Sequence, residues 1–181
     1  MNKVEPIRSK EKIEKMKTEL IKRGYRDYLL FVMGINTGLR ISELLRLKVK
    51  DVKNKSHIIL KENKTDKRKK FLINSHLKED LEKFITGMQS EEFLFQSQKG
   101  DNKPISRVQA YRILNAAAEK AGIENVGTHT LRKTFGYFHY MEYRDVALLQ
   151  ELFNHSSPSI TLDYIGINQD NMDRTIEDFY L

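Results

Sequence analysis

The sequence predicts a mainly α-helical domain with a small three-stranded antiparallel β-sheet. Apolar residues recur at helical spacing over most of the chain, whereas two short β-prone runs flank a polar, basic segment. No internal repeat, low-complexity tract or Gly/Ser-rich linker divides the 181 residues. We therefore expect residues 1–181 to form a single domain around one hydrophobic core.

Three helices are predicted in the first part of the chain. The first follows Ser9, a residue type that caps helices, and ends at Gly24. The second covers the apolar run 28–35, which is followed by breaker-like residues. The third is short, spans residues 41–47 and begins next to Arg40.

The middle of the chain has the pattern of a β-hairpin. Residues 57–60 and 71–73 are β-prone runs on either side of a basic segment, and residues 49–52 are a candidate third strand. Residues 92–95 are expected to be extended. Further helices are expected over residues 77–88, 108–120, 130–143, 146–153, 158–167 and 171–180.

The charge balance favours a polyanionic partner. Lys and Arg total 32 against 25 Asp and Glu, for a formal net charge of +7, and nucleic acid is the simplest such partner. The absence of cysteine excludes disulfides and thiolate metal sites and fits a cytoplasmic protein. The longest apolar run, residues 28–35, is far shorter than the roughly 20 residues of a membrane span, so no membrane partner is expected.

Four separated segments carry residue types suited to chemistry on a phosphate. They are TGLRISE (residues 37–43), the basic hairpin around Lys64, HTLR (residues 129–132), and Asn154-His155 followed by Tyr164. In order and spacing this set resembles the active-site signature of the tyrosine recombinase (phage integrase) family. Each segment alone is common, but the ordered set is specific and covers most of the chain.

The resemblance implies the catalytic-domain fold of DNA breaking-rejoining enzymes and a covalent bond between a tyrosine and DNA. Because the transition state of phosphodiester attack carries extra negative charge, two guanidinium groups and hydrogen-bond donors suit the task. The implied catalytic residues are Arg40, Lys64, His129, Arg132, His155 and Tyr164, with Glu43 in a supporting role.

Within this set Tyr164 is the implied nucleophile, and a hairpin lysine is the implied general acid for the departing 5′ oxygen. Lys64 is our choice for that acid, with Lys67 as the alternative. The other nearby cations are expected to contact the DNA backbone: Lys61, Lys67, Arg68, Lys69, Lys70 and Lys133.

The chain departs from the family where Asn154 stands in place of the glycine that usually precedes the second histidine. Asparagine tolerates the left-handed conformation that closes a helix, so we expect the turn before His155 to survive. Transesterification retains the bond energy and needs no cofactor or metal. The chain has no phosphate-binding Gly-x-x-x-x-Gly-Lys loop, and its histidines lack ligand spacing.

The resemblance also implies an organisation and partners. Residues 1–8 are interpreted as a linker remnant, and we expect the chain, as a fragment or a short relative, to lack the family's N-terminal core-binding domain. The apolar stripe in residues 170–181 is expected to form a helix that packs on its own domain or on a neighbouring subunit. The implied partners are double-stranded DNA and accessory DNA-bending proteins. The chain is expected to be a monomer without DNA and to form a tetramer on DNA. Its expected place is the nucleoid in the cytoplasm, in a bacterial, phage or mobile-element context.

Three alternatives remain at this point. A type IB topoisomerase uses nearly the same residues but relaxes supercoils. A regulator could retain the fold and bind DNA without cutting it. A basic helical interaction protein is the third.

Overall fold

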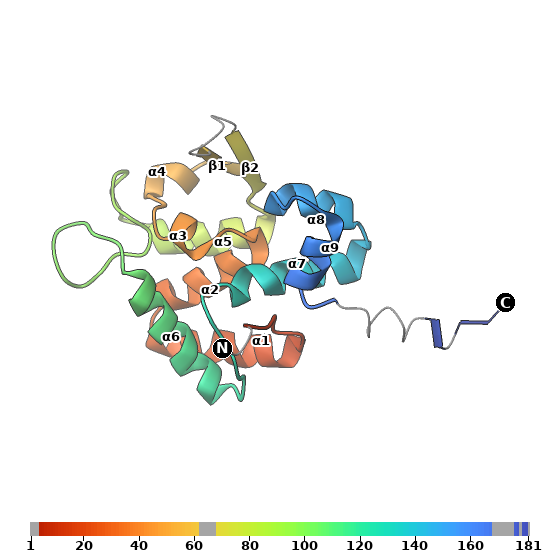
Figure 1. Ribbon diagram of the computed structural model, residues 1–181. Helices are drawn as coiled ribbons and strands as arrows, with labels where there is room; N and C mark the ends of the chain where they lie inside the picture. The colour runs from red at the N-terminus through yellow and green to blue at the C-terminus, as the bar shows by residue number, and fades with distance from the viewer. Residues whose placement is uncertain (1–3, 62–67, 168–175, 178, 181) are drawn as a thin grey trace.

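The computed structural model describes residues 4–61, 68–167, 176–177 and 179–180. Long helices pack around a central pair, α2 (Tyr25–Thr37) and α7 (Thr130–Tyr143), and α1 (Lys10–Arg23) lies against α2. The helices α5 (Ser75–Ile85) and α6 (Arg107–Lys120) complete this part (Figure 1). The main hydrophobic core lies between these helices, with Phe31, Leu29, Met33 and Leu114 fully buried.

The ends of α1 are set by local chemistry, as the sequence predicted. The Ser9 side chain accepts a hydrogen bond from the Lys12 backbone N–H at 3.2 Å, which satisfies one of the free donors of the first turn. Gly24 ends the helix with φ +140°, a backbone conformation that L side chains rarely adopt. Among the described residues, no helix is long and apolar enough to cross a membrane.

The sheet is smaller than expected. Strands β1 (His57–Lys61) and β2 (Arg68–Leu72) pair antiparallel, and the described residues contain no third strand. The prediction of a strand over Val49–Val52 was wrong, because these residues form a helical turn, α4. Both valines are buried three residues apart, on one face of that turn.

The expected extended piece at residues 92–95 lies beside the start of α4. Phe93 forms an isolated antiparallel bridge with Lys48, and the Leu94 N–H donates to the Leu47 carbonyl at 2.9 Å. This pairing ends at Val49, whose N–H donates to the Glu92 carbonyl. The short helix α3 (Ile41–Leu44) immediately precedes this region.

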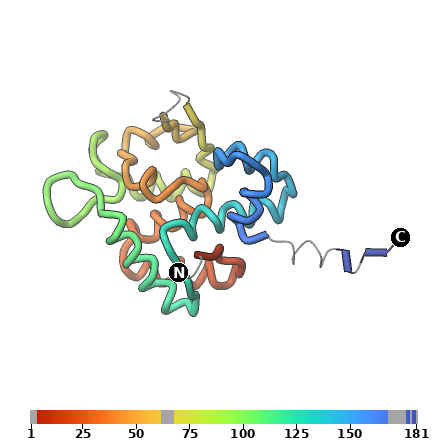
Figure 2. Tube along the Cα trace, viewed as in Figure 1, coloured from red at the N-terminus to blue at the C-terminus, as the bar shows by residue number. Residues whose placement is uncertain are grey.

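The last described elements form a smaller cluster at one end of α7. Helices α8 (Val146–Phe153) and α9 (Pro158–Tyr164) contact each other and bury a second apolar cluster. The tube in Figure 2 shows this blue pair set apart from the red and orange helices. The prediction of α8 is confirmed to the residue, whereas α9 ends before Gly166, where φ is +77°. The helix expected over residues 171–180 lies mostly outside the described residues.

Candidate active site

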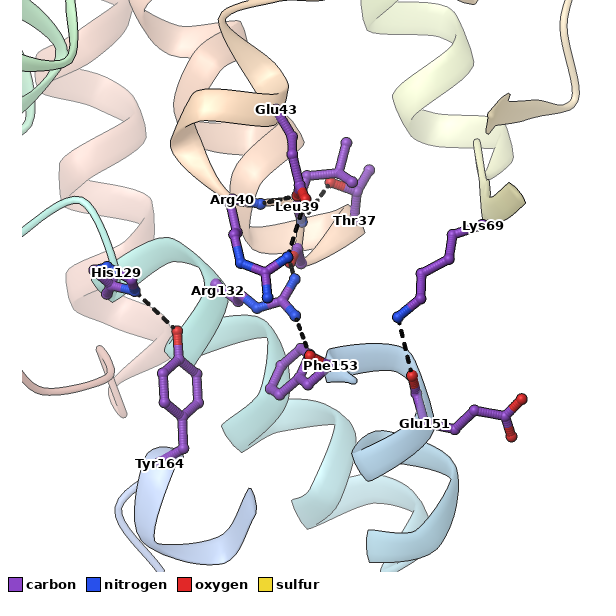
Figure 3. Close-up of polar contacts among 11 residues, drawn as sticks. Thr37, Leu39, Arg40, Glu43, Lys69, His129, Arg132, Glu151, Phe153 and Tyr164 are labelled. Atoms are coloured by element: carbon purple, nitrogen blue, oxygen red, sulfur yellow. Dashed lines mark hydrogen bonds and ion pairs between the residues drawn. The ribbon is translucent and has the colours of Figure 1, made fainter. Parts of the chain in front are cut away.

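Close packing of α2 against α7 brings two of the expected arginines together. Gly38 ends α2 in the left-handed conformation, and a Cβ added there would clash with the Phe135 ring. A Cβ added at Gly34 would likewise clash with the Leu131 side chain. The contact places Arg40, at the start of α3, near Arg132 in the first turn of α7, as Figure 3 shows.

Arg132 is buried, with 3 % exposure, and its guanidinium is fixed from several sides. It donates to the Gly38 carbonyl at 2.5 Å and to the Phe153 carbonyl at 3.0 Å. Its carbon Cζ lies 4.2 Å from the centroid of the Phe153 ring. Burial lowers the pKa of Arg132 to about 10, and the charge of Arg40 adds to this shift. Arg132 nevertheless stays a rigid cation at neutral pH. Its guanidinium links α7 to the end of α2 at Gly38 and to α8 at Phe153.

Arg40 is more exposed and is held by Glu43. One Glu43 carboxylate oxygen accepts from the Arg40 backbone N–H at 2.7 Å, and the other accepts from Arg40 Nη1 at 3.0 Å. The side chain of Arg40 is 49 % exposed. Glu43 therefore caps α3 and orients a guanidinium that remains open to solvent (Figure 3).

The Tyr164 hydroxyl lies beside His129. Its oxygen is 3.2 Å from His129 Nδ1, and the two rings meet edge to face. Burial lowers the pKa of His129, and the charges of Lys133, Arg107, Arg132 and Arg40 lower it further. The neutral imidazole is thus favoured, and in that form one ring nitrogen accepts a hydrogen bond.

His155 packs against the Tyr164 ring. The centroids of the two rings are 5.0 Å apart, and His155 Nδ1 lies 3.1 Å from the hydroxyl oxygen of buried Thr161. Asn154 has φ +56° in the left-handed region, as expected for the turn that presents His155. Burial lowers the pKa of His155, with smaller contributions from the charges of Arg132, Arg40 and Lys69.

Tyr164 itself is partly buried among cations. Burial raises its pKa, while the charges of Arg132 and Arg40 and a hydrogen bond from Arg132 act in the opposite direction. The Lys133 ammonium lies 5.0 Å from the centroid of the Tyr164 ring. Lys133 is only 5 % exposed, so in this structure it lies under the tyrosine. Its expected contact with DNA stays a prediction.

The described part of the hairpin brings one expected cation to the site. Lys69 on β2 donates from Nζ to the Glu151 carbonyl at 3.3 Å and so links the sheet to α8 (Figure 3). Lys61, Arg68 and Lys70 also lie on the two strands and are exposed. The candidate general acid Lys64 and its alternative Lys67 lie outside the described residues.

Two residues near the site were not singled out from the sequence. Thr161 is fully buried and orients His155. The sequence feature that could have revealed it is a polar residue at a position of α9 that faces inward. Arg107, at the start of α6, is close enough to His129 to lower its pKa, but its place depends on tertiary packing. In the described part of the chain, no three His, Asp or Glu side chains are placed to share a metal ion.

Three histidines at or near the site predict a pH-dependent stability. The pKa values of His129, His155 and His139 are lowered mainly by burial. The unfolded chain therefore takes up protons first as the pH falls below about 6.5. We expect the thermal unfolding midpoint to fall between pH 7.5 and 5.5, and His155→Gln to reduce the slope. A midpoint that is constant or rises on acidification would contradict this expectation.

The fold and the arrangement of arginines, histidines and tyrosine define the class of protein: this chain belongs to the Phage integrase family, whose pattern matches residues 8–171. It is 53 % identical over 170 residues to the probable integrase/recombinase YoeC of Bacillus subtilis, across 94 % of this chain and 93 % of that protein. It is 27 % identical to the tyrosine recombinase XerA of Pyrococcus furiosus, across 93 % of this chain and 60 % of that protein.

Solved structures confirm the fold. A crystal structure of XerA recombinase superimposes with a TM-score of 0.78 at 21 % identity, covering 100 % of this chain and 66 % of that one. A XerH recombinase complex gives 0.76 at 24 % identity, covering 98 % of this chain and 53 % of that one. The chain therefore spans about half to two thirds of these solved recombinases.

Proposed function

We propose that this chain is the catalytic domain of a site-specific DNA recombinase that cuts and rejoins DNA through a 3′-phosphotyrosyl intermediate. The observation that supports it best is the convergence of Tyr164, His129 and Arg132, which come from α9 and from the start of α7. Arg40 joins them from α3. These are a nucleophile, a proton acceptor and two cations around one position.

The two arginines would stabilise the charge that develops on the phosphate. In the pentavalent transition state the non-bridging oxygens gain negative charge, and fixed guanidinium groups lower its energy because they need no reorganisation. Arg132 is fixed by two backbone carbonyls, and Arg40 by Glu43. The exposure of Arg40 leaves its guanidinium accessible to a phosphate from solvent.

Residues of this chain can accept and donate the protons that the reaction moves. The Tyr164 oxygen forms a bond to phosphorus while the bond from phosphorus to the 5′ oxygen breaks. The phenol proton passes to neutral His129, whose Nδ1 is 3.2 Å away, and the 5′ oxygen takes a proton from Lys64. A 5′ hydroxyl of another DNA end then reverses the step and releases the tyrosine.

The partners follow from this activity. Duplex DNA is the proposed substrate of residues 1–181, acting as a single catalytic domain, and the net charge of +7 suits it. We propose a monomer without DNA and a tetramer on DNA, with accessory DNA-bending proteins, in the nucleoid of a bacterial cytoplasm. The XerH neighbour was solved on a palindromic difH substrate, which suits paired subunits.

The function is tested by trapping the intermediate. The chain is incubated with a pool of nicked duplexes of random sequence, in which cleavage next to the nick releases a short fragment that diffuses away. We expect a protein–DNA adduct that survives denaturation, without ATP. Binding without an adduct would favour a regulator. In a parallel assay on supercoiled plasmid, relaxation with no transfer of strands between two duplexes would favour the topoisomerase alternative.

The general acid is tested with an altered leaving group. Lys64→Ala should lower the rate of adduct formation by about 10²–10⁴-fold, the usual contribution of general acid catalysis. A bridging sulfur in place of the 5′ oxygen should restore most of the rate, because a thiolate leaves without a proton. Lys67→Ala is the matched control and should respond little to the sulfur. Rescue of Lys67→Ala instead of Lys64→Ala would reverse the assignment.

A further inference from the structure

The N-terminal segment Val4–Arg8, which we call the strap, contacts residues close in sequence to the proposed catalytic ones. Although these residues were expected to be part of a linker remnant, Ile7 is only 3 % exposed and joins the main core. Figures 1 and 2 show the dark-red segment passing beside the start of α7 and the blue segment that follows α9. The strap therefore packs against the elements that carry the proposed catalytic residues.

Two of its contacts are made with the elements around α7. Val4 lies so close to Gly127 that a Cβ on this glycine would stand 2.9 Å from Val4 Cγ2, and Gly127 is two residues before His129. The Ile7 backbone N–H donates to the buried Thr134 hydroxyl at 2.9 Å. Thr134 is two residues after Arg132.

The third contact is made by Arg8 with the end of the nucleophile helix. Arg8 Nη2 donates to the Gly166 carbonyl at 3.1 Å, two residues after Tyr164. The Arg8 guanidinium also lies 5.6 Å from the centroid of the Tyr137 ring on α7. One side chain thus links α7 to the turn that ends α9.

These contacts act on the C-terminal end of α9, beside Ile165, which is fully buried in the second apolar cluster with Phe153. The helix has only seven residues, too short to be stable without tertiary contacts. The turn that follows depends on Gly166 at φ +77°. A displacement of that turn would move the Tyr164 oxygen relative to His129, and misplacement by about 1 Å can cost on the order of 10²-fold in rate.

We propose that Arg8 is a positioning residue for the nucleophile: by holding the Gly166 carbonyl against α7, it sets the distance between the Tyr164 oxygen and the cations that bind the phosphate. Arg8 contacts neither Tyr164 nor the proposed phosphate position directly. The inference rests on the function proposed above, since it assigns a role in placing that nucleophile.

The test separates placement from binding. Adduct formation by Arg8→Ala is followed in single turnovers at saturating nicked DNA, and DNA affinity is measured separately. We expect the maximal rate to fall roughly tenfold and the affinity to stay within twofold of the wild type. Arg8→Lys, which keeps one donor, should recover part of the rate. Glu5→Gln is the matched control, because it removes the ion pair to Arg8 at 3.2 Å and leaves the Gly166 contact.

A second readout does not require activity. In the protein labelled with ¹³C in its tyrosine rings, the Tyr164 signal is assigned by its loss in Tyr164→Phe. Arg8→Ala should shift or broaden this signal, whereas Glu5→Gln should leave it unchanged. An unchanged Tyr164 signal, or a wild-type maximal rate in Arg8→Ala, would overturn the inference. If the wild type forms no adduct, the proposed function fails, and the ring signal alone decides the role of Arg8.

Discussion

Replacing Tyr164 by phenylalanine is expected to abolish adduct formation, with a loss on the order of 10⁴-fold or more in cleavage rate. The change removes one oxygen, the proposed nucleophile. The ring packs against Phe153 and His155 at centroid distances of 5.6 and 5.0 Å, and phenylalanine can keep those contacts. Gel electrophoresis under denaturing conditions measures the loss.

The fold of Tyr164→Phe should be preserved. The variant loses the contact between the hydroxyl and His129 at 3.2 Å, and a single hydrogen bond contributes about 1 kcal/mol to the free energy of unfolding. Tyr143→Phe on α7 is the matched control, since Tyr143 is 67 % exposed. Adducts that persist in Tyr164→Phe and vanish in another tyrosine variant would refute the assignment of the nucleophile.

Arg132→Lys is also expected to slow cleavage strongly. The guanidinium donates to two carbonyls from different elements, Gly38 and Phe153, and an ammonium cannot reproduce that planar fork. We expect the cleavage rate to fall by about 10²–10³-fold, as for the loss of a fixed donor to a transition state. Single-turnover cleavage at saturating DNA measures it.

Arg132→Lys should also reduce stability, and by more than Tyr164→Phe does. Lysine would leave a buried carbonyl without its donor, at a cost of about 1–3 kcal/mol in the free energy of unfolding. Chemical denaturation of Arg132→Lys beside Arg23→Lys, an arginine with a 43 % exposed side chain, isolates the effect of burial. A lysine variant with wild-type rate and stability would contradict the role proposed for Arg132.

Elements with strong local signals were predictable from the sequence. Helices α7 and α8 begin and end where periodicity and caps placed them, and Ser9 and Asn154 adopt their expected capping conformations. The residues Val49–Val52 were misjudged, because β-branched valines favour strands, whereas their spacing of three residues places both on one face only in a helical turn. The turn is held by the local hydrogen bond from the Lys48 N–H to the Asp51 carboxylate and by the pairing of Lys48 with Phe93, which is distant in the sequence.

Contacts of the candidate site between residues of the sequence motif were predictable from the sequence. Contacts that depend on tertiary packing were less predictable. The contact between His129 and Tyr164 joins positions that the motif had selected. In contrast, the burial of Lys133 depends on how α9 covers the first turn of α7. The contact of Arg8 with Gly166 spans 158 positions in the sequence, and no local pattern predicts it.

The most direct measurement of the central claim is mass spectrometry of the peptide trapped on a nicked duplex. After digestion, the account predicts that one peptide within residues 145–167 carries the nucleotide and that fragmentation places it on Tyr164. A nucleotide attached to any other residue, or its absence when cleavage has occurred, would contradict the account.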